Sequence, residues 1–255
     1  MILWMVLKTY YKYIYNYIYN YSIMDKEIII LTIASRGNIY DKFLSEYWIP
    51  MIKYSKKKYN NIKIYLLFGK DTYINDLEEI KDNIIVTPYD ESYKNILEKT
   101  LYAFDYCLKT FKFDFIFRTN LSSFIILNKL IDVTKNINQN NYIGGIIGNH
   151  GGIKFIGGAG IWFSNDVINN IIINRNLIIN DVIDDVDLGK YLQDKYTYNP
   201  LPRFDIITYN NISIFELNRI LNYIINTNQY HIRLKNPNRL VDIQTAMFLT
   251  KYFYK

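Results

Sequence analysis

The sequence predicts one α/β domain with a mostly parallel central sheet flanked by helices. Short apolar runs rich in β-branched and aromatic residues alternate with longer segments that repeat apolar residues at helical spacing. This is the pattern of strands joined by crossover helices. The 255 residues, half of them apolar and 21% charged, are enough for a sizeable core. Beyond the first 23 residues we find no linker, low-complexity boundary or repeat, which favours a single domain over 24–255.

Strands are predicted where a short apolar run is bounded by loop residues. The predicted strands cover 27–34, 63–69, 83–86, 113–117, 142–147 and 230–235. Helices are predicted where apolar residues recur every three or four positions. The predicted helices cover 41–53, 91–110, 123–135, 165–173, 188–192 and 239–252. A glycine-dense segment follows the strand 142–147, and His150 within it is read as a surface loop residue.

Residues 1–23 form a separate Tyr-rich extension. Their Tyr/Ile/Asn repeat carries lysines and asparagines, which makes it a poor membrane span, and no signal-peptide pattern is present. Three readings remain: a weak membrane-surface anchor, an ordered extra element, or an upstream extension with Met24 as the true start. The last is favoured. The sequence thus predicts a soluble or peripheral protein and leaves its localisation open.

The charge balance favours an anionic partner without choosing one. Thirty basic and 24 acidic residues give a net charge of +6, which suits nucleotide diphosphates, nucleic acid or a membrane surface. Nucleic acid is the weakest of these, because the charge is spread out and no nucleic-acid motif is present. The single cysteine, Cys107, excludes an intramolecular disulfide and is predicted to pack in the core.

The stretch 113–124 changes character at its middle, where a buried strand pattern turns polar. Arg118, Thr119, Asn120 and Ser122 follow the apolar run. Ligands of open α/β sheets bind just beyond the carboxyl ends of strands, so these side chains are candidates for a binding site. The alternative is a polar turn in which Asn or Ser caps the next helix.

Four segments resemble, in sequence order, the motifs of the inverting β-1,3-galactosyltransferase and Fringe-like glycosyltransferases. They are 90–100 (DESYKNILEKT), 117–122 (FRTNLS), 157–164 (GGAGIWFS) and 184–189 (DDVDLG). The resemblance implies a GT-A fold, a nucleotide-sugar donor such as a uridine diphosphate sugar, and inversion at the anomeric carbon by a single displacement. It also implies a glycan or glycoconjugate acceptor and a hexosyl- or N-acetylhexosaminyltransferase activity.

The resemblance and the loop positions together select the site residues. The donor-binding candidates are Ser35, Arg36, Asp90, Lys99, Arg118, Thr119, Asn120, Ser122, Gly158, Gly160, Arg233 and Lys235. Asp185 matches the family's catalytic aspartate and is the candidate general base. The alternative is that acidic residues simply begin a helix there. Trp162 and Asp184 are candidates for the wall that faces the acceptor and the sugar; core packing is an equal alternative for Trp162.

The metal-binding motif is the main departure from the family that the sequence resembles. Asn120 and Ser122 stand where the family has its metal-binding Asp-x-Asp, and Mn²⁺ and Mg²⁺ prefer carboxylate oxygens. His231 is the candidate for the family's late metal-binding histidine. His231, Arg233 and Lys235 alternate along a strand, so they are expected on one face, either meeting an anion or lying on an exposed edge.

This departure leaves three alternatives. The site binds metal weakly, basic side chains replace the metal, or catalysis has been lost. The last outcome corresponds to the alternative function, a non-catalytic nucleotide- or sugar-binding protein on the same fold.

Overall fold

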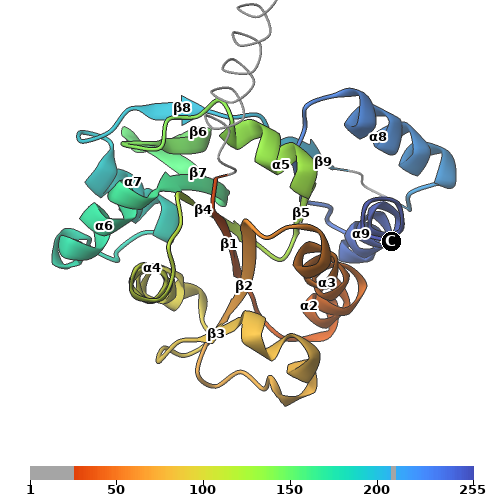
Figure 1. Ribbon diagram of the computed structural model, residues 1–255, viewed down its shortest axis with the longest axis horizontal. Coiled ribbons are helices and arrows are strands. Elements are labelled where there is room, and N and C mark those ends of the chain that lie inside the picture. Colours follow the sequence, from red (N-terminus) through yellow and green to blue (C-terminus); the bar gives the residue numbers. More distant parts are fainter. Residues whose placement is uncertain (1–25, 208–210) are drawn as a thin grey trace, which may run out of the picture.

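The computed structural model of the chain describes residues 26–207 and 211–255. The predicted N-terminal extension, residues 1–23, lies outside these ranges. The described chain folds into an α/β domain whose helices cover both faces of a central sheet (Figure 1). The predicted fold class is confirmed.

A seven-stranded sheet forms the middle layer. Its strands in spatial order are β3 (Ile84–Val86), β2 (Ile62–Phe68), β1 (Ile28–Ile33), β4 (Phe115–Asn120), β7 (Ile153–Ser164), β6 (Ile143–His150) and β8 (Tyr198–Pro200). All neighbours are parallel except where β7 pairs with β4 and with β6. The two central strands β1 and β4 are nearly continuous apolar runs over most of their length, as burial on both faces requires.

The carboxyl ends of β1 and β4 lie side by side in the middle of this sheet. Ile33, the last residue of β1, is in register with Asn120, the last residue of β4. From β1 the chain continues to β2 and β3 on one side, and it adds β4 on the other side only later. Such a reversal of strand order opens a crevice at the carboxyl edge, where open α/β sheets bind their ligands.

A three-stranded sheet continues from the end of β4. It contains β5 (Ser123–Ile125), β10 (His231–Leu234) and β9 (Phe204–Ile206), with β10 in the middle. The helix predicted over 123–135 is therefore wrong at its start, and α5 begins only at Leu127. Residues 123–125 form a strand despite their helical spacing. Antiparallel pairing with β10, from the C-terminal part of the chain, provides hydrogen-bond partners for the backbone of β5.

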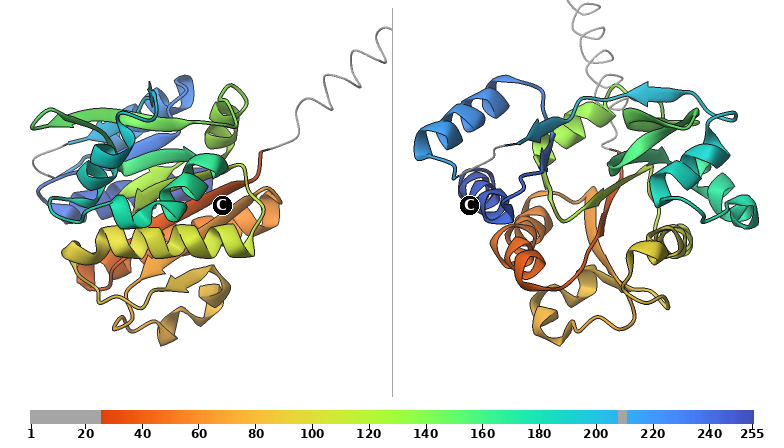
Figure 2. Two further views of the ribbon diagram at one scale, coloured as in Figure 1. Left: turned by 90° about the vertical axis from the view of Figure 1, so that its left-hand side faces the viewer. Right: turned by 180° about the vertical axis from the view of Figure 1, so that it is seen from behind.

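Helices form the two outer layers (Figure 1). One layer contains α2 (Asn38–Phe43), a π-helical segment (Leu44–Trp48), α3 (Ile49–Lys58), α5 (Leu127–Thr134), α8 (Ile214–Asn226) and α9 (Arg239–Phe253). The other contains α4 (Ile96–Thr110), α6 (Asn165–Ile173) and α7 (Asp184–Leu192). Short 3₁₀ segments cover Asn75–Asn83, Tyr93–Asn95 and Arg175–Leu177. The rear view in Figure 2 shows α4 and the α2–α3 pair on opposite sides of β1.

The glycine-dense segment is a β-hairpin. β6 extends to His150 and β7 begins at Ile153, so the strand predicted over 142–147 continues to the turn. Gly151 and Gly152 form the turn with φ angles of 58° and 90°, a conformation that glycine adopts without steric cost. The hairpin carries the Gly157–Gly160 segment back into the sheet beside β4.

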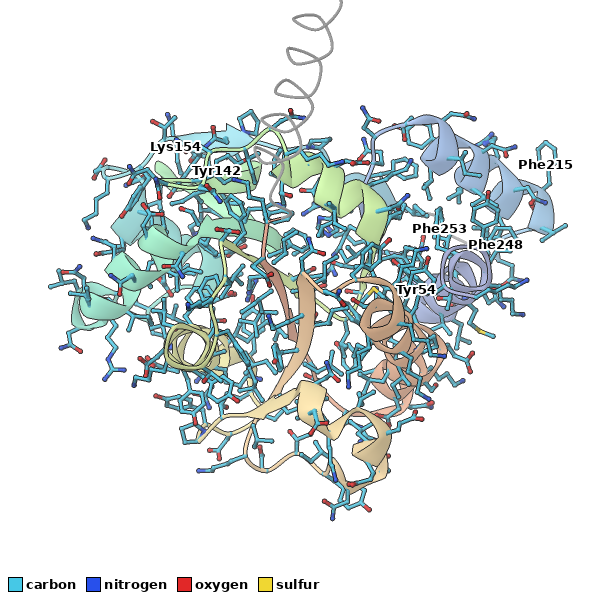
Figure 3. The ribbon with its side chains drawn as sticks, in the orientation of Figure 1. Tyr54, Tyr142, Lys154, Phe215, Phe248 and Phe253 are labelled. Atoms are coloured by element: carbon cyan, nitrogen blue, oxygen red, sulfur yellow. The ribbon has the colours of Figure 1, made fainter. Side chains whose placement is uncertain are left out.

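The core lies on both faces of the sheet and includes the largest aromatic side chains. Trp48 and Trp162 are fully buried on the face covered by α2 and α3. Cys107 packs on the other face, as predicted, and burial raises the pKa of its thiol to about 12. Phe215 stands exposed on α8 (Figure 3). Within the described ranges, no helix has both the length and the apolar character required to cross a bilayer.

Candidate active site

A pocket of about 370 Å³ lies at the adjoining carboxyl ends of β1 and β4. Its lining residues come from these two ends, from α2, from the segment that leads into α4, and from β10. They are Ile33, Ser35, Tyr40, Glu91, Ser92, Tyr93, Ile96, Asn120, Leu121, Ser122 and Arg233. The pocket therefore occupies the position at which the strand order reverses, and it contains four of the predicted site residues.

Glu91 organises one wall of this pocket. Its carboxylate accepts hydrogen bonds from the Gly69 amide at 2.8 Å and from the Ser35 hydroxyl at 3.2 Å. It also pairs with Lys99, a fully buried lysine on α4. Because Lys99 is committed to Glu91, it acts on the pocket through that carboxylate. The predicted helix over 91–110 accordingly begins later, at Ile96, and leaves Glu91 free to turn inward.

Asp90 and Arg36 are among the predicted donor-binding residues that lie outside this pocket lining. Asp90 is exposed and pairs with Lys70 at 3.0 Å, so its neighbour Glu91 is the carboxylate that faces the pocket. Arg36 donates to Asp76 and Asp41, and the hydrogen bond to Asp76 is the main cause that raises the pKa of its guanidinium. Arg36 thereby ties the start of α2 to the 3₁₀ segment Asn75–Asn83.

Arg118 and Asp184 form a nearly buried ion pair. Their side chains are 4% and 10% exposed. The same guanidinium donates to the carbonyl oxygen of Gly158 on β7. A β-carbon on Gly158 would lie 2.6 Å from Arg118 Nη1, so a larger residue here would displace the guanidinium. The predicted residues Arg118, Gly158 and Asp184 are thus brought together from three separate elements.

Asp185 lies at the first turn of α7 beside this ion pair. Its Oδ2 accepts a 2.6 Å hydrogen bond from the Gly158 amide, whereas its buried Oδ1 has no partner among the described residues. Burial raises the pKa of the carboxyl group, and the negative charge of Asp184 adds to that effect. Asp185 also borders a small cavity of about 10 Å³ lined mainly by apolar side chains. A half-buried carboxylate with a free oxygen is a group that can accept a proton.

Tyr93 connects the acidic pair to the pocket. Its side chain lines the pocket and is largely exposed. Partial burial raises the pKa of its hydroxyl, and so do the nearby negative charges of Asp184 and Asp185. The two carboxylates therefore lie near the pocket wall to which Tyr93 belongs.

Arg233 closes the floor of the pocket beside the end of β4. Its Nη1 donates to the Asn120 side-chain oxygen and to the Ser122 hydroxyl. Ser123 also donates to the Asn120 oxygen, at 3.2 Å. β10 brings Arg233 to this place by pairing with β5. The structure thus joins three predicted residues, Asn120, Ser122 and Arg233, into one cluster.

His231 is buried behind this cluster. Its Nε2 lies 3.1 Å from the Ser123 hydroxyl, and its ring packs edge-on against Phe117. Burial lowers the pKa of His231 well below its ordinary value, and the positive charges of Arg203 and Arg233 lower it further. A β-carbon on Gly160 would lie 2.2 Å from His231 Cε1, so the histidine ring fills the space that this glycine leaves.

The residues present do not fit a divalent metal ion. Among the described residues, no group of three or more His, Cys, Asp and Glu side chains could hold one. The oxygens of Asn120 and Ser122, which match the family's metal ligands, both accept hydrogen bonds from the Arg233 cation. His231 faces a serine hydroxyl rather than a carboxylate. A metal at this point would meet two neutral oxygens and a guanidinium, a poor ligand set for Mn²⁺ or Mg²⁺.

Three further predicted residues are placed away from the pocket. Trp162 is fully buried and donates to the Tyr230 hydroxyl at 2.9 Å, so the core-packing alternative holds and no face is open to a sugar. The Thr119 hydroxyl donates to the Ala159 carbonyl at 2.6 Å and ties β4 to β7. Lys235 follows the end of β10 and is exposed, so it does not share the buried position of His231.

Sequence reasoning missed three pocket residues. Glu91 stands one position from a predicted residue, and a buried lysine eight positions later is its partner. Tyr40 and Tyr93 stand at the pocket as partly exposed aromatic rings, 41% and 67% exposed. In a chain with 26 tyrosines, nothing in the sequence distinguishes these two.

A second pocket, of about 490 Å³, lies away from these residues. It is lined by aromatic and basic side chains of α3, α5 and α9, among them Tyr54 and Phe253 (Figure 3). It contains neither a carboxylate nor any predicted site residue. The convergence of polar groups therefore identifies the smaller pocket as the candidate active site.

No protein-family model matches the chain, and no curated protein matches it. Among solved structures it resembles a glycosyltransferase involved in the glycosylation of the major capsid of PBCV-1. That match has a TM-score of 0.52 and 8% identity, and it covers 86% of this chain and 98% of the other.

Two weaker matches are to a galactosyltransferase and a mannosyltransferase. The galactosyltransferase LgtC, in complex with donor and acceptor sugar analogues, matches with a TM-score of 0.47 and 10% identity, over 86% of this chain and 95% of the other. The mannosyltransferase PcManGT from Pyrobaculum calidifontis, in complex with GDP-Man and Mn²⁺, matches with a TM-score of 0.46 and 10% identity. That match covers 89% of this chain and 71% of the other. At such identities, the comparisons show the fold, which is the GT-A fold of glycosyltransferases.

Proposed function

We propose that the protein is a glycosyltransferase that moves a hexose or N-acetylhexosamine from a nucleotide-diphosphate donor to a hydroxyl group of a glycan or glycoconjugate. The observation that carries the proposal is a half-buried carboxylate with one unpartnered oxygen, Asp185, whose charge acts on Tyr93 in the wall of the pocket at the reversal point of the sheet. The GT-A fold supports it, as does the resemblance of four segments to inverting β-1,3-galactosyltransferase and Fringe-like enzymes, which favours a uridine diphosphate donor.

The pocket suits the donor in size and chemistry. About 370 Å³ lies within the range of small-ligand sites, roughly 300–1,000 Å³. Tyr40 and Tyr93 offer aromatic faces on which a nucleobase or a sugar ring can stack. Ser35 and Glu91 offer oxygens to ribose or sugar hydroxyls. The donor's diphosphate would then lie toward Asn120 and Ser122.

The proposed reaction is a single displacement. The acceptor oxygen attacks the anomeric carbon, its proton passes to Asp185, and the bond from that carbon to the diphosphate oxygen breaks. The electron pair of the broken bond leaves on the diphosphate. Because its pKa is raised, Asp185 is a stronger base than an exposed aspartate. Attack opposite the leaving group inverts the configuration.

Arg118 adjusts the charge around the proposed base, Asp185. By pairing with Asp184 it neutralises one of two adjacent carboxylates, so a second negative charge does not have to be solvated in the same place. Two buried polar groups of the network lack partners among the described residues: Nε of Arg118, a donor, and Oδ1 of Asp185, an acceptor. A hydroxyl group both accepts and donates a hydrogen bond, so an acceptor hydroxyl has the chemistry that either group lacks.

The test measures transfer and donor binding on the same variants. Asp185→Asn keeps the shape and removes the base, so we expect transfer to fall by about 100-fold or more while donor affinity and Tm stay near those of the unsubstituted protein. Asp194→Asn, an exposed residue just beyond α7, changes the charge equally and should have no effect. A panel of nucleotide sugars identifies the donor, and the anomeric configuration of the product reports inversion. Unchanged transfer in Asp185→Asn would refute the assignment.

The second candidate is a non-catalytic nucleotide- or sugar-binding protein. It is favoured by one observation, the neutral Asn120 and Ser122 where the family has carboxylates. It predicts that nucleotide sugars raise the Tm of the protein but are not consumed, with or without acceptor. Release of nucleoside diphosphate in the presence of an acceptor would exclude this candidate.

A further inference from the structure

Arg233 differs from the other buried or half-buried arginines in its partners. Arg118, Arg203 and Arg239 each pair with an aspartate, and so does Arg36. Arg233 forms no direct ion pair with any described residue, although it is half-buried. Its only hydrogen-bond acceptors there are the neutral oxygens of Asn120 and Ser122. Asp205 and Asp242 act on Arg233 at longer range, but each of them pairs directly with another arginine. A half-buried charge without a direct counter-ion is costly, so this position indicates an anion that the described chain does not supply.

The geometry leaves a defined part of the guanidinium for that anion. A guanidinium has five N–H donors, two of them on Nη1. Both described bonds use Nη1, so the donors on Nε and Nη2 have no described partner. Asn120 and Ser122 thereby hold the group in one orientation while it lines the pocket. An Nε–Nη2 edge is the fork that binds two oxygens of a phosphate side by side.

The charge of Arg233 persists at physiological pH. Burial lowers the pKa of its guanidinium to about 10, and the positive charges of Arg239 and Arg203 contribute. That value still leaves the group charged near neutrality. The two neighbouring arginines add to the positive potential at this end of β10, although their own aspartates partly offset it.

We infer that the Arg233 guanidinium binds the diphosphate of the donor and takes the place of a divalent metal ion. The inference rests on the proposed function, and it specifies how that site holds its most highly charged group. A nucleoside diphosphate binds with its phosphate oxygens on the Nε–Nη2 edge. When the bond to the sugar breaks, negative charge develops on the departing diphosphate, and the fixed cation stabilises it. Metal ions are not required for this step.

The experiment is calorimetric titration with uridine diphosphate and with inorganic pyrophosphate, each in chelator and then in Mn²⁺. We expect both ligands to bind in chelator, and Mn²⁺ to change the affinity by less than about threefold. Arg233→Met should weaken binding by about 100-fold, and Arg233→Lys, which keeps the charge but loses the fork, by about tenfold. Arg219→Met, on the exposed surface of α8, removes the same charge and should bind normally.

Thermal unfolding of the same variants separates a binding role from a structural one. A guanidinium without a counter-ion is expected to cost stability, so Arg233→Met should unfold at the same temperature as the unsubstituted protein or higher. If that variant fails to fold, Arg233→Lys provides the binding comparison on a folded protein. Equal affinity in the unsubstituted protein and in Arg233→Lys, together with loss of folding in Arg233→Met, would overturn the inference.

Two other outcomes have different meanings. If uridine diphosphate binds only when Mn²⁺ is present, a metal holds the diphosphate and the inference is overturned, while the proposed transferase stands. If uridine, guanosine, cytidine and thymidine diphosphates all fail to bind in either buffer, the donor class itself is wrong. In that case the proposed function falls together with the inference.

Discussion

The amide N–H of Gly158 donates a 2.6 Å hydrogen bond to Oδ2 of Asp185. The carbonyl oxygen of the same residue accepts from Arg118. One backbone position on β7 therefore holds both the candidate base and the cation that neutralises its neighbour Asp184. The position of Asp185 depends on a close approach of the β7 backbone, which a β-carbon at Gly158 would disturb.

Gly158→Ala tests this relationship. The added methyl group would lie 2.6 Å from Arg118 Nη1 and 3.1 Å from Asp185 Oδ2, so one of these side chains must move. We expect transfer to fall by about 10-fold to 100-fold, because a displacement of about 1 Å in a reacting group has effects of that size. Donor affinity should change little. Transfer is measured as nucleoside diphosphate released at saturating donor.

Gly157→Ala is the matched control. A β-carbon there would have its nearest neighbour, the Ile146 carbonyl oxygen, at 3.7 Å, which is ordinary contact. This variant makes the same chemical change one residue away and should keep normal activity. Equal losses in the two variants would indicate a general effect on β7 and would contradict the positioning of Asp185 by Gly158.

The pH dependence of transfer should report the ionisation of Asp185. Burial, and after it the charge of Asp184, raises the pKa of Asp185, and the base must be ionised to act. Activity should therefore fall on acidification at a pH above the ordinary aspartate value of about 3.9. Asp184→Asn removes the neighbouring negative charge and leaves Arg118 without its partner. Both changes lower the pKa of Asp185, so the acid limb of residual activity should move to lower pH.

Breaking the pair between Arg118 and Asp184 also destabilises the fold, by about 3–5 kcal/mol if the pair behaves like other buried ion pairs. The shape of the pH profile is therefore compared after scaling each curve to its own maximum. Asp194→Asn should leave the acid limb unchanged. An acid limb that stays in place in Asp184→Asn would mean that a group other than Asp185 controls it.

Trp162 should affect stability and leave acceptor affinity unchanged. Trp162→Phe removes the donor to the buried Tyr230 hydroxyl and leaves a small cavity, so we expect a loss of about 2 kcal/mol in the free energy of unfolding. Combining it with Tyr230→Phe removes both polar groups. The pair should then cost less than the sum of the single changes, as a double-mutant cycle in denaturant would show. A raised KM for acceptor in Trp162→Phe, with normal stability, would restore the sugar-wall hypothesis.

His231 should make the fold less stable in acid. Its folded-state pKa lies well below the unfolded value of about 6.5, so the unfolded chain binds the proton more readily. The contribution of His231 to the free energy of unfolding is then fully present above about pH 6.5, and it is lost as the pH falls below that value. The loss amounts to at most about 1.4 kcal/mol for each pH unit below 6.5. Replacing His231 by Gln removes this contribution, so the Tm of the variant should depend less on pH over this interval. An identical pH dependence in both proteins would show that His231 does not bind its proton mainly on unfolding.

Local pattern was sufficient for most of the fold and for part of the site. Strands such as β1 and β4 and helices such as α6 can be predicted from apolar periodicity. Burial on one or both faces requires apolar residues at regular spacing along the sequence. Asp185 was selected as the candidate base because a short motif and a helix start coincide. The polar residues after β4 were found because the ends of parallel strands are where an α/β sheet can leave side chains unpaired with the core.

Only the tertiary structure decided which of these residues meet. The pairing of β5 with β10 brings Arg233 to Asn120, and no local periodicity in either segment encodes that contact. Glu91 faces the pocket instead of Asp90 because a buried lysine on α4 holds it, and Trp162 lies in the core because Tyr230 and two phenylalanines surround it. A side chain's environment is made by segments distant in sequence, so the sequence determined the candidates and long-range packing determined their roles.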